Sequence, residues 1–521
     1  DLPGAGEQEP MAEYRIANVK TSSADKDASS AFLKYKDFSH YADYFNGMED
    51  ENIVQAIPNA KASEWMEDNI PLFECPQRNF EEMYYYRWWS LRKHIKETPV
   101  GYGMTEFLVQ RSYSDKYNLI ACAIGHHIYE SRWLRDPKYL DQIIHTWYRG
   151  NDGGPMKKMN KFSSWNADAV LARYMVDGDK DYLLDMKKDL ETEYQRWERT
   201  NRLKNGLYWQ GDVQDGMEES ISGGRRKKYA RPTINSYMYG NAKALSCIGI
   251  LSGDEGMAMK YGMRADTLKN LVENELWNTR HQFFETMRTD SSANVREAIG
   301  YIPWYFNLPD TTQKYEIAWK EIMDEKGFSA PYGLTTAERR HPEFRTRGVG
   351  KCEWDGAIWP FASAQTLTAM ANFMNNYPQT VLSDSVYFRQ MELYVESQYH
   401  RGRPYIGEYL DEVTGYWLKG DQERSRYYNH STFNDLIITG LIGLRPRLDN
   451  TIEVNPLIPA DKWDWFCLDN VLYHGHNLTI LWDKNGDRYH CGKGLRIFVD
   501  GKEVGQADTL TKIICENALK W

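Results

Sequence analysis

Apolar residues recur at three- and four-residue spacing over much of the chain, from about residue 80 to 445. This periodicity is typical of amphipathic helices. Between the periodic stretches lie short Gly/Asp segments such as VDGDKD and LSGDEG, which predict tight helix–helix turns. The stretches predicted to be helical are 118–134, 137–148, 164–177, 179–197, 233–251, 256–276, 313–324, 354–376, 386–399 and 431–442.

About a dozen helices joined as successive hairpins, with aromatic loops between alternate pairs, predict a mainly α fold of the (α/α)6 toroid type. The loops of such a ring line a funnel at one end. A plain helical solenoid is the structural alternative, but the sequence shows no repeat of fixed period. We therefore expect a toroid domain over residues 31–445.

After residue 445 the pattern changes to short β-rich runs. TIEVNPLIP, NLTILWDKNGDRYHC and GLRIFVDGKEVGQA are separated by turn signals that include Asn-Gly and Asp-Gly. This pattern predicts a small β-sandwich domain over 446–521. Residues 1–30 are polar and rich in Gly, Ser and Asp, which predicts a mobile segment or one ordered only by lying on the main body.

Composition narrows the class of ligand. The 521 residues include 18 Trp and 36 Tyr, more than a core needs, and these side chains suit surfaces that stack against partly polar ligands such as sugars or nucleobases. The net charge is −10, and no run of Lys and Arg is longer than RRKK at 225–228. A nucleic-acid binder normally has a basic surface. A carbohydrate partner is therefore favoured over a nucleic acid.

Cysteine spacing and hydropathy argue against further classes of protein. The cysteines at 75, 122, 247, 352, 467, 491 and 515 form no C-x-x-C pair, so neither a zinc-ribbon nor a redox motif is present, and their odd number does not suggest a disulfide framework. No apolar run approaches the ~18–20 residues of a membrane span. The chain begins at Asp1 rather than Met, and we expect a removed leader and export to the periplasm or cell surface.

The segment DGMEESISGG places three acids, Asp215, Glu218 and Glu219, in a loop just before a predicted helix. A solvated surface loop is the simplest interpretation. The aromatic pair Tyr208 and Trp209 lies a few residues earlier, which favours a catalytic acid at the mouth of a sugar pocket.

A second acidic loop reads IGEYLDEVTG and contains Glu408. Two acids from distant loops suit glycoside hydrolysis, in which one carboxyl donates a proton to the leaving oxygen and the other activates water or attacks carbon. Inverting enzymes place the two about 6.5–9.5 Å apart and retaining enzymes about 5–5.5 Å apart.

Aromatic segments supply candidates for sugar binding. In EWDGAIW, Trp354 and Trp359 with Asp355 form either a sugar platform or a buried pair with Asp355 as a helix N-cap. Two interpretations of the segment YYYRWWS stay open: it forms a core helix, or it forms the floor of a sugar subsite. The candidate substrate-binding residues are Arg87, Trp88, Trp89, Trp165, Trp209, Asn235, Tyr237, Trp354, Asp355, Trp359 and His430.

Together these stretches resemble six-hairpin glycosidases of the clan that includes trehalase-like, family 63 and mannosylglycerate-hydrolase-like enzymes. DGMEESISG resembles the clan's E-S-G-M-D-N-S/A segment, which implies that Glu218 is the general acid. IGEYLDEVTG resembles its E-N-Y-D-P-x-T-G segment, which implies that Glu408 is the base. EWDGAIWPFASAQTL resembles its substrate-contacting Y-W-R-G-P-I-W segment, and LWNTRHQFFETM at 276–287 resembles a turn common after one hairpin. In its general character the sequence is similar to those of carbohydrate-degrading proteins of gut Bacteroidetes.

The resemblance covers roughly 80–445 and implies an inverting exo-glycosidase that acts on an α-linked sugar in polysaccharide degradation, without a catalytic metal or other cofactor. A structural calcium and the oligomeric state are left open. Two departures stand out. The clan's early W-D motif corresponds to Trp88-Trp89, without the Asp, and Glu218 replaces an Asp, so Asp215 remains an alternative acid.

Two other functions stay open at this point. A polysaccharide lyase on an α/α toroid needs a Tyr or His base and cations near a uronate, and Tyr239, His430, Arg231 and Arg424 are candidates. The second alternative is a glycan-binding protein without catalysis.

Overall fold

The computed structural model describes residues 32–312 and 314–520, and the segment predicted to be mobile at 1–30 lies outside them. The helices are α1 (Ser39–Asn46), α2 (Ala62–Asn69), α3 (Arg78–Lys93), α4 (Ile124–Ser131), α5 (Lys138–Arg149), α6 (Asn166–Asp177), α7 (Lys180–Asp185), α8 (Lys187–Asn201), α9 (Pro232–Ser252), α10 (Glu255–Leu271), α11 (Ile302–Tyr305), α12 (Pro360–Asn376), α13 (Asp384–Ser397) and α14 (Asn434–Leu436).

The strands are mostly short until the last quarter of the chain. They are β1 (Leu72–Glu74), β2 (Ile95–Thr98), β3 (Gly101–Met104), β4 (Trp209–Gln210), β5 (Tyr229–Ala230), β6 (Trp277–Asn278), β7 (Phe283–Phe284), β8 (Ser329–Ala330), β9 (Gly333–Leu334), β10 (Tyr399–His400), β11 (Arg403–Pro404), β12 (Ile452–Val454), β13 (Trp465–Tyr473), β14 (His476–Asp483), β15 (Gly494–Val499), β16 (Lys502–Ala507) and β17 (Ile513–Cys515).

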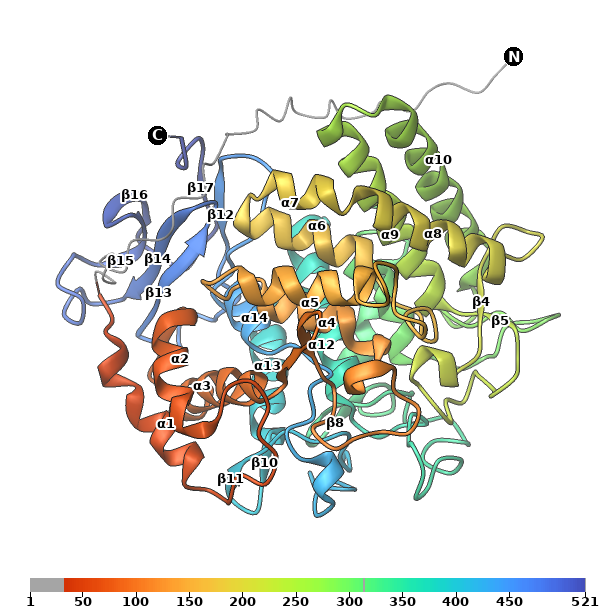
Figure 1. Ribbon diagram of the computed structural model, residues 1–521, viewed down its shortest axis with the longest axis horizontal. Coiled ribbons are helices and arrows are strands. Elements are labelled where there is room, and N and C mark those ends of the chain that lie inside the picture. Colours follow the sequence, from red (N-terminus) through yellow and green to blue (C-terminus); the bar gives the residue numbers. More distant parts are fainter. Residues whose placement is uncertain (1–31, 313, 521) are drawn as a thin grey trace.

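The helices form the predicted α/α toroid. α9 packs against α10, α6 and α8, while α12 packs against α11 and α13. Figure 1 shows α5, α6 and α8 crossing the molecule with α12 behind them, and α10 at the side opposite the C-terminal strands. No helix within 32–312 or 314–520 is long and apolar enough to cross a membrane.

The predicted turns VDGDKD and LSGDEG are confirmed. Each helix ends at a glycine in the left-handed region, Gly178 (φ 70°) after α6 and Gly253 (φ 73°) after α9, where a side chain would be strained. The following aspartates, Asp179 and Asp254, accept backbone N–H bonds as N-caps of the next helices. The chain therefore reverses within a few residues at both places.

Several predicted helix boundaries differ from the structure. The stretch predicted at 118–134 becomes α-helical only at Ile124, after left-handed backbone angles at Tyr117 and Asn118 (φ 63° and 62°) and a 3-10 turn over Ala121–Ala123. The stretch at 354–376 begins at Pro360, whose ring fits the first position of a helix. The last stretch is a short α-turn continued by a π-turn over Ile437–Leu441, and 313–324 is a 3-10 helix over Glu316–Ile322.

The C-terminal part is an antiparallel sheet in the order β1-β13-β14-β15-β16, with β12 and β17 paired beside it. The edge strand β1 comes from the helical part of the chain and pairs with β13, so that Leu72 lies opposite Asp469. The His474 N–H also donates to the Val176 carbonyl at the end of α6 (2.8 Å). The sheet is thus attached to the helical body.

Candidate active site

Three loops that are far apart in sequence are joined into one layer. The segment that contains EWDGAIW lies between the two acidic loops: Lys351 is 3.7 Å from the Glu219 carboxylate, and its carbonyl accepts a bond from the Tyr409 hydroxyl. Ile358 and Leu410 exchange two backbone hydrogen bonds of 3.0 Å. The loops of Glu218 and Glu408 are therefore held on either side of this segment.

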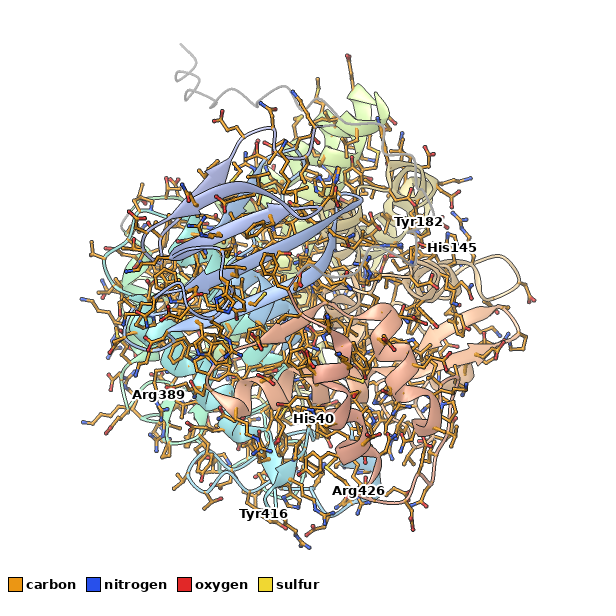
Figure 2. The ribbon with its side chains drawn as sticks, turned by 90° about the vertical axis from the view of Figure 1, so that its left-hand side faces the viewer. His40, His145, Tyr182, Arg389, Tyr416 and Arg426 are labelled. Atoms are coloured by element: carbon orange, nitrogen blue, oxygen red, sulfur yellow. The ribbon has the colours of Figure 1, made fainter. Side chains whose placement is uncertain are left out.

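A fourth loop, directly after β3, extends the layer. The Tyr428 N–H donates to the carbonyl of Ile406 (3.1 Å), and the Asn429 N–H donates to the carbonyl of Glu106 (2.9 Å). Figure 2 shows Tyr416 and Arg426, both from the segment after Glu408, at the lower edge of the molecule. Glu408 itself is only 5% exposed.

Glu218 is held in a largely buried position after the left-handed turn at Gly216 (φ 71°). Burial raises the pKa of Glu218 to about 7, and the negative charges of Glu408 and Asp212 add to the rise, while Arg225 opposes it. Among the described residues no Lys, Arg or His side chain forms an ion pair with Glu218 within 4.0 Å. A carboxyl in these surroundings holds its proton near neutral pH.

Glu408 has different neighbours. Its Oε2 lies 3.9 Å from Lys419 Nζ and 3.7 Å from Arg424 Nη2. Burial raises the pKa of Glu408, whereas the positive charges of Lys419, Arg424 and Arg111 lower it. Oε2 is buried and accepts no hydrogen bond from a described residue, which is typical of a position that a ligand or water occupies.

An aromatic cluster surrounds this layer. The Trp359 ring stacks between Trp354 (4.6 Å) and Tyr409 (4.5 Å), and Phe361 lies edge-on to His430 (5.8 Å). The indole N–H of Trp354 is buried without a partner among the described residues. Protein rings therefore cover both faces of Trp359, and the Trp354 N–H is the polar group of this stack that is left for a sugar hydroxyl.

The floor of the cluster continues to Trp165. Its ring packs against His126 (5.0 Å) and Tyr237 (4.9 Å), and its N–H donates to the Tyr305 hydroxyl (3.1 Å). Trp165 and Tyr237 are fully buried behind Phe361. Of the predicted sugar-binding residues, the structure thus brings Trp354, Trp359 and His430 near Glu408, with Trp165 and Tyr237 behind them.

The contacts of Asp215 indicate a structural role. Its side chain is completely buried, bonds Arg231 Nε at 2.6 Å, and accepts hydrogen bonds from the hydroxyls of Ser163 and Thr233. Both carboxylate oxygens are therefore occupied by protein groups. This argues against Asp215 as the alternative acid.

Asn235 and Asp355 differ in what they leave free for substrate. Asn235 bonds the backbone of Tyr208 through both its oxygen and its nitrogen, which does not support the predicted substrate contact. Asp355 accepts the N–H groups of Arg347 (2.6 Å) and Gly348 (2.9 Å) through Oδ2 and does not cap the following helix, whose N-cap is Trp359. Its Oδ1 is buried and has no partner among the described residues, so one oxygen is left for a ligand or water.

The aromatic helix α3 and Trp209 lie outside the cluster. Trp88 and Trp89 are fully buried, and Trp89 packs against Phe45 of α1 with its N–H bonded to Asn46. Arg87 is buried in hydrogen bonds to Gln398 and to Ser431, next to His430. Trp209 lies under Lys228 (4.7 Å). These contacts do not support the predicted subsite floor on α3.

The residues considered for a lyase are dispersed. Arg231 is paired with Asp215, while the charges that act on Tyr239 are those of Asp266 and Glu273. Burial lowers the pKa of His430 well below its usual range, and nearby His126 and Arg87 reinforce this. The structure therefore does not assemble the base and cations of a lyase.

Glu106, which the sequence analysis did not single out, also faces this site. It is 3% exposed, and burial raises its pKa to about 8, with the charges of Glu408 and Glu218 adding to the rise. The sequence around Glu106, Thr-Glu-Phe, matches no motif, so only the fold shows that Glu106 lies at this site. Within the described ranges, no group of three or more His, Cys, Asp or Glu is arranged to hold a metal ion.

Comparison with known proteins gives two family matches. Residues 116–431 match the mannosylglycerate hydrolase MGH1-like glycoside hydrolase domain, and residues 444–505 match the C-terminal domain of glycosyl hydrolase family 65.

Solved structures agree on the fold. A protein named sialidase is 95% identical over 96% of this chain, with a TM-score of 0.94, and the chain spans 46% of that protein's length. The GH63 mannosylglycerate hydrolase of Thermus thermophilus is 13% identical over 68% of this chain and 99% of its own, with a TM-score of 0.50. The GH78 rhamnosidase of Bacillus sp. GL1 is 10% identical over 82% of this chain and 41% of its own, with a TM-score of 0.56.

Proposed function

The chain belongs to the mannosylglycerate hydrolase MGH1-like glycoside hydrolases, and we propose on that premise that it is an exo-acting, inverting enzyme that cleaves an α-linked sugar. Glu218 is the general acid and Glu408 the general base. The family match confirms the resemblance to six-hairpin glycosidases inferred from the sequence. The exo action and the α-linkage rest on that resemblance.

One observation carries the assignment of roles, namely the difference in charge around the two acids. Glu218 is largely buried and has acidic neighbours, so its proton is retained to about pH 7. Glu408 lies among Lys419, Arg424 and Arg111, which favour its ionised form. Burial raises the pKa of both carboxyls, but among the described residues only Glu408 has cations within 4.0 Å that oppose the rise. A protonated donor opposite a carboxyl whose ionised form is favoured by cations is the arrangement that general acid–base catalysis requires.

The reaction follows from this arrangement. The protonated Glu218 donates to the glycosidic oxygen as the bond to the anomeric carbon breaks. Glu408 accepts a proton from a water molecule, whose oxygen attacks that carbon from the opposite face. The Trp354 N–H donates a hydrogen bond to the sugar, and the exclusion of water by the surrounding rings strengthens the electrostatic effects of both acids.

The biological setting is proposed on sequence grounds. We propose export to the periplasm or cell surface and a role in polysaccharide degradation, without a cofactor. The sialidase name describes a protein about twice this length, of which the chain spans 46%, so the proposal does not take its sugar from that name.

The configuration of the first product tests the mechanism. A panel of 4-nitrophenyl α-glycosides identifies a substrate, and ¹H NMR then follows the anomeric protons during the first minutes of hydrolysis. We expect the β-anomer to appear first and the α-anomer only later by mutarotation. Early formation of the α-anomer would show retention, and Glu408 would then be a nucleophile rather than a base.

A further inference from the structure

We propose that Glu106 is a third carboxyl of the active site and binds the substrate as a neutral acid, by donating a hydrogen bond to one sugar hydroxyl. The proposal rests on the proposed function, because it assigns a specificity-determining residue to the same site. Glu106 lies ten residues before the region that matches the family, so that match assigns it no role.

The backbone fixes Glu106 beside the acid pair. The Asn429 side chain donates to the Thr105 carbonyl (3.0 Å) and the Asn429 N–H donates to the Glu106 carbonyl (2.9 Å). The loop after β3 is therefore hydrogen-bonded to the segment that leads to His430. The Glu106 carboxyl then lies 3.9 Å from His430 Nδ1.

The carboxyl has few protein partners for a buried acid. Its Oε1 accepts a bond from the Cys122 thiol (3.3 Å), which is a weak donor, and none of the described residues bonds Oε2. Its only neighbour of basic type within 4.0 Å in the described ranges is His430, which is neutral because burial lowers its pKa. Glu106 is thus neither ion-paired nor fully hydrogen-bonded by the protein.

Two other acids of this chain, one buried and one partly buried, show what a structural role looks like. Glu130 accepts three backbone N–H groups at the start of α14. Glu193 accepts the Tyr148 hydroxyl and the Asn166 amide, one on each oxygen. These acids use both oxygens, and protein groups satisfy them. Glu106 differs because its second oxygen is left for a group that the protein does not supply.

The protonation state determines what Glu106 can bind. Burial and the charges of Glu408 and Glu218 keep its proton to about pH 8, so it is a hydrogen-bond donor at neutral pH. A donor aimed at a sugar hydroxyl gives specificity, because a substrate without that hydroxyl leaves the buried acid unpaired. The ligand class is therefore a glycoside with a hydroxyl opposite Glu106.

The test couples a variant with altered substrates. The probes are the 4-nitrophenyl glycoside that is hydrolysed fastest and its series of monodeoxy derivatives. We expect Glu106→Ala to lower kcat/KM by about 10- to 100-fold for the parent glycoside. For one monodeoxy derivative the same variant should change kcat/KM by about threefold or less, because the hydroxyl that Glu106 bonds is already missing. Glu106→Gln, which keeps a donor, should recover most of the parent activity.

An equal loss for every derivative, or no loss for the parent glycoside, would overturn the proposal. Glu193→Gln is the matched control, since it alters a partly buried structural acid and should show no dependence on the missing hydroxyl. If Glu106→Ala does not fold, Glu106→Asp serves instead, because it withdraws the carboxyl by one methylene.

A second readout separates this proposal from the catalytic one. Binding of the free monosaccharides to wild type and Glu106→Ala is measured by tryptophan fluorescence, which does not require turnover. If no glycoside is hydrolysed, the catalytic proposal fails, and weaker binding of one sugar by Glu106→Ala would still support Glu106 as a binding residue. Equal binding of every sugar that wild type binds would overturn it.

Discussion

Glu218→Gln is expected to lower kcat by about 10²- to 10⁴-fold for glycosides with poor leaving groups, while the protein stays folded. The amide has nearly the same shape as the acid but no proton to donate to the departing oxygen. With a 2,4-dinitrophenyl glycoside of the same sugar the loss should be much smaller, because that group leaves without protonation. Steady-state kinetics on an alkyl and a dinitrophenyl glycoside measure both values.

Asp215→Asn, three residues earlier in the same loop, is the control. Asp215 is fully buried against Arg231, and removing its charge should lower the free energy of unfolding by about 3–5 kcal/mol, since a buried cation is left unpaired. Urea denaturation measures this loss. If Asp215→Asn instead shows the leaving-group dependence and Glu218→Gln does not, Asp215 is the proton donor.

Glu408→Gln is expected to lower kcat by a similar factor, about 10²- to 10⁴-fold, because no group remains to accept the proton of the attacking water. Sodium azide should restore part of the turnover and yield a glycosyl azide, since azide attacks without a base. Lys419 and Arg424 lie within 4.0 Å of the carboxylate and would attract the anion once the charge of Glu408 is gone.

Glu412→Gln controls for this effect. Glu412 lies four residues after Glu408 and pairs with Arg345, so its loss should affect stability without creating a response to azide. Near-normal turnover of Glu408→Gln, or a low rate that azide leaves unchanged with every substrate, would contradict the role of Glu408 as base.

The helical fold could be predicted because it is encoded locally. Three- and four-residue periodicity and turns such as that at Gly178 depend on a few neighbouring residues. The start of α4 could not be placed, since the apolar pattern continues through a segment that turns at Tyr117 and Asn118. The edge strand β1 pairs with residues almost 400 positions away, and its three residues carry no signal of that partner.

Part of the candidate site could also be predicted, because local sequence segments encode it. The loops of Glu218 and Glu408 carry recognisable segments, and the fold brings both into one layer. For Trp88 and Trp89 the sequence left a core helix and a subsite floor open, because it shows an aromatic pair but not that α1 covers Trp89. The sequence did not single out Glu106, because its buried position depends on the packing of Cys122 and of the far more distant His430 around it.

The pH dependence of kcat/KM tests most directly the central claim, that a protonated Glu218 and an ionised Glu408 act together. Because the pKa of Glu218 is raised to about 7, activity should fall as the pH rises through that value and the donor loses its proton. Activity should also fall at low pH, where Glu408 becomes protonated, which gives a bell-shaped profile whose limbs belong to the coupled pair. A profile that stays flat or rises from pH 6 to pH 9 would contradict the account.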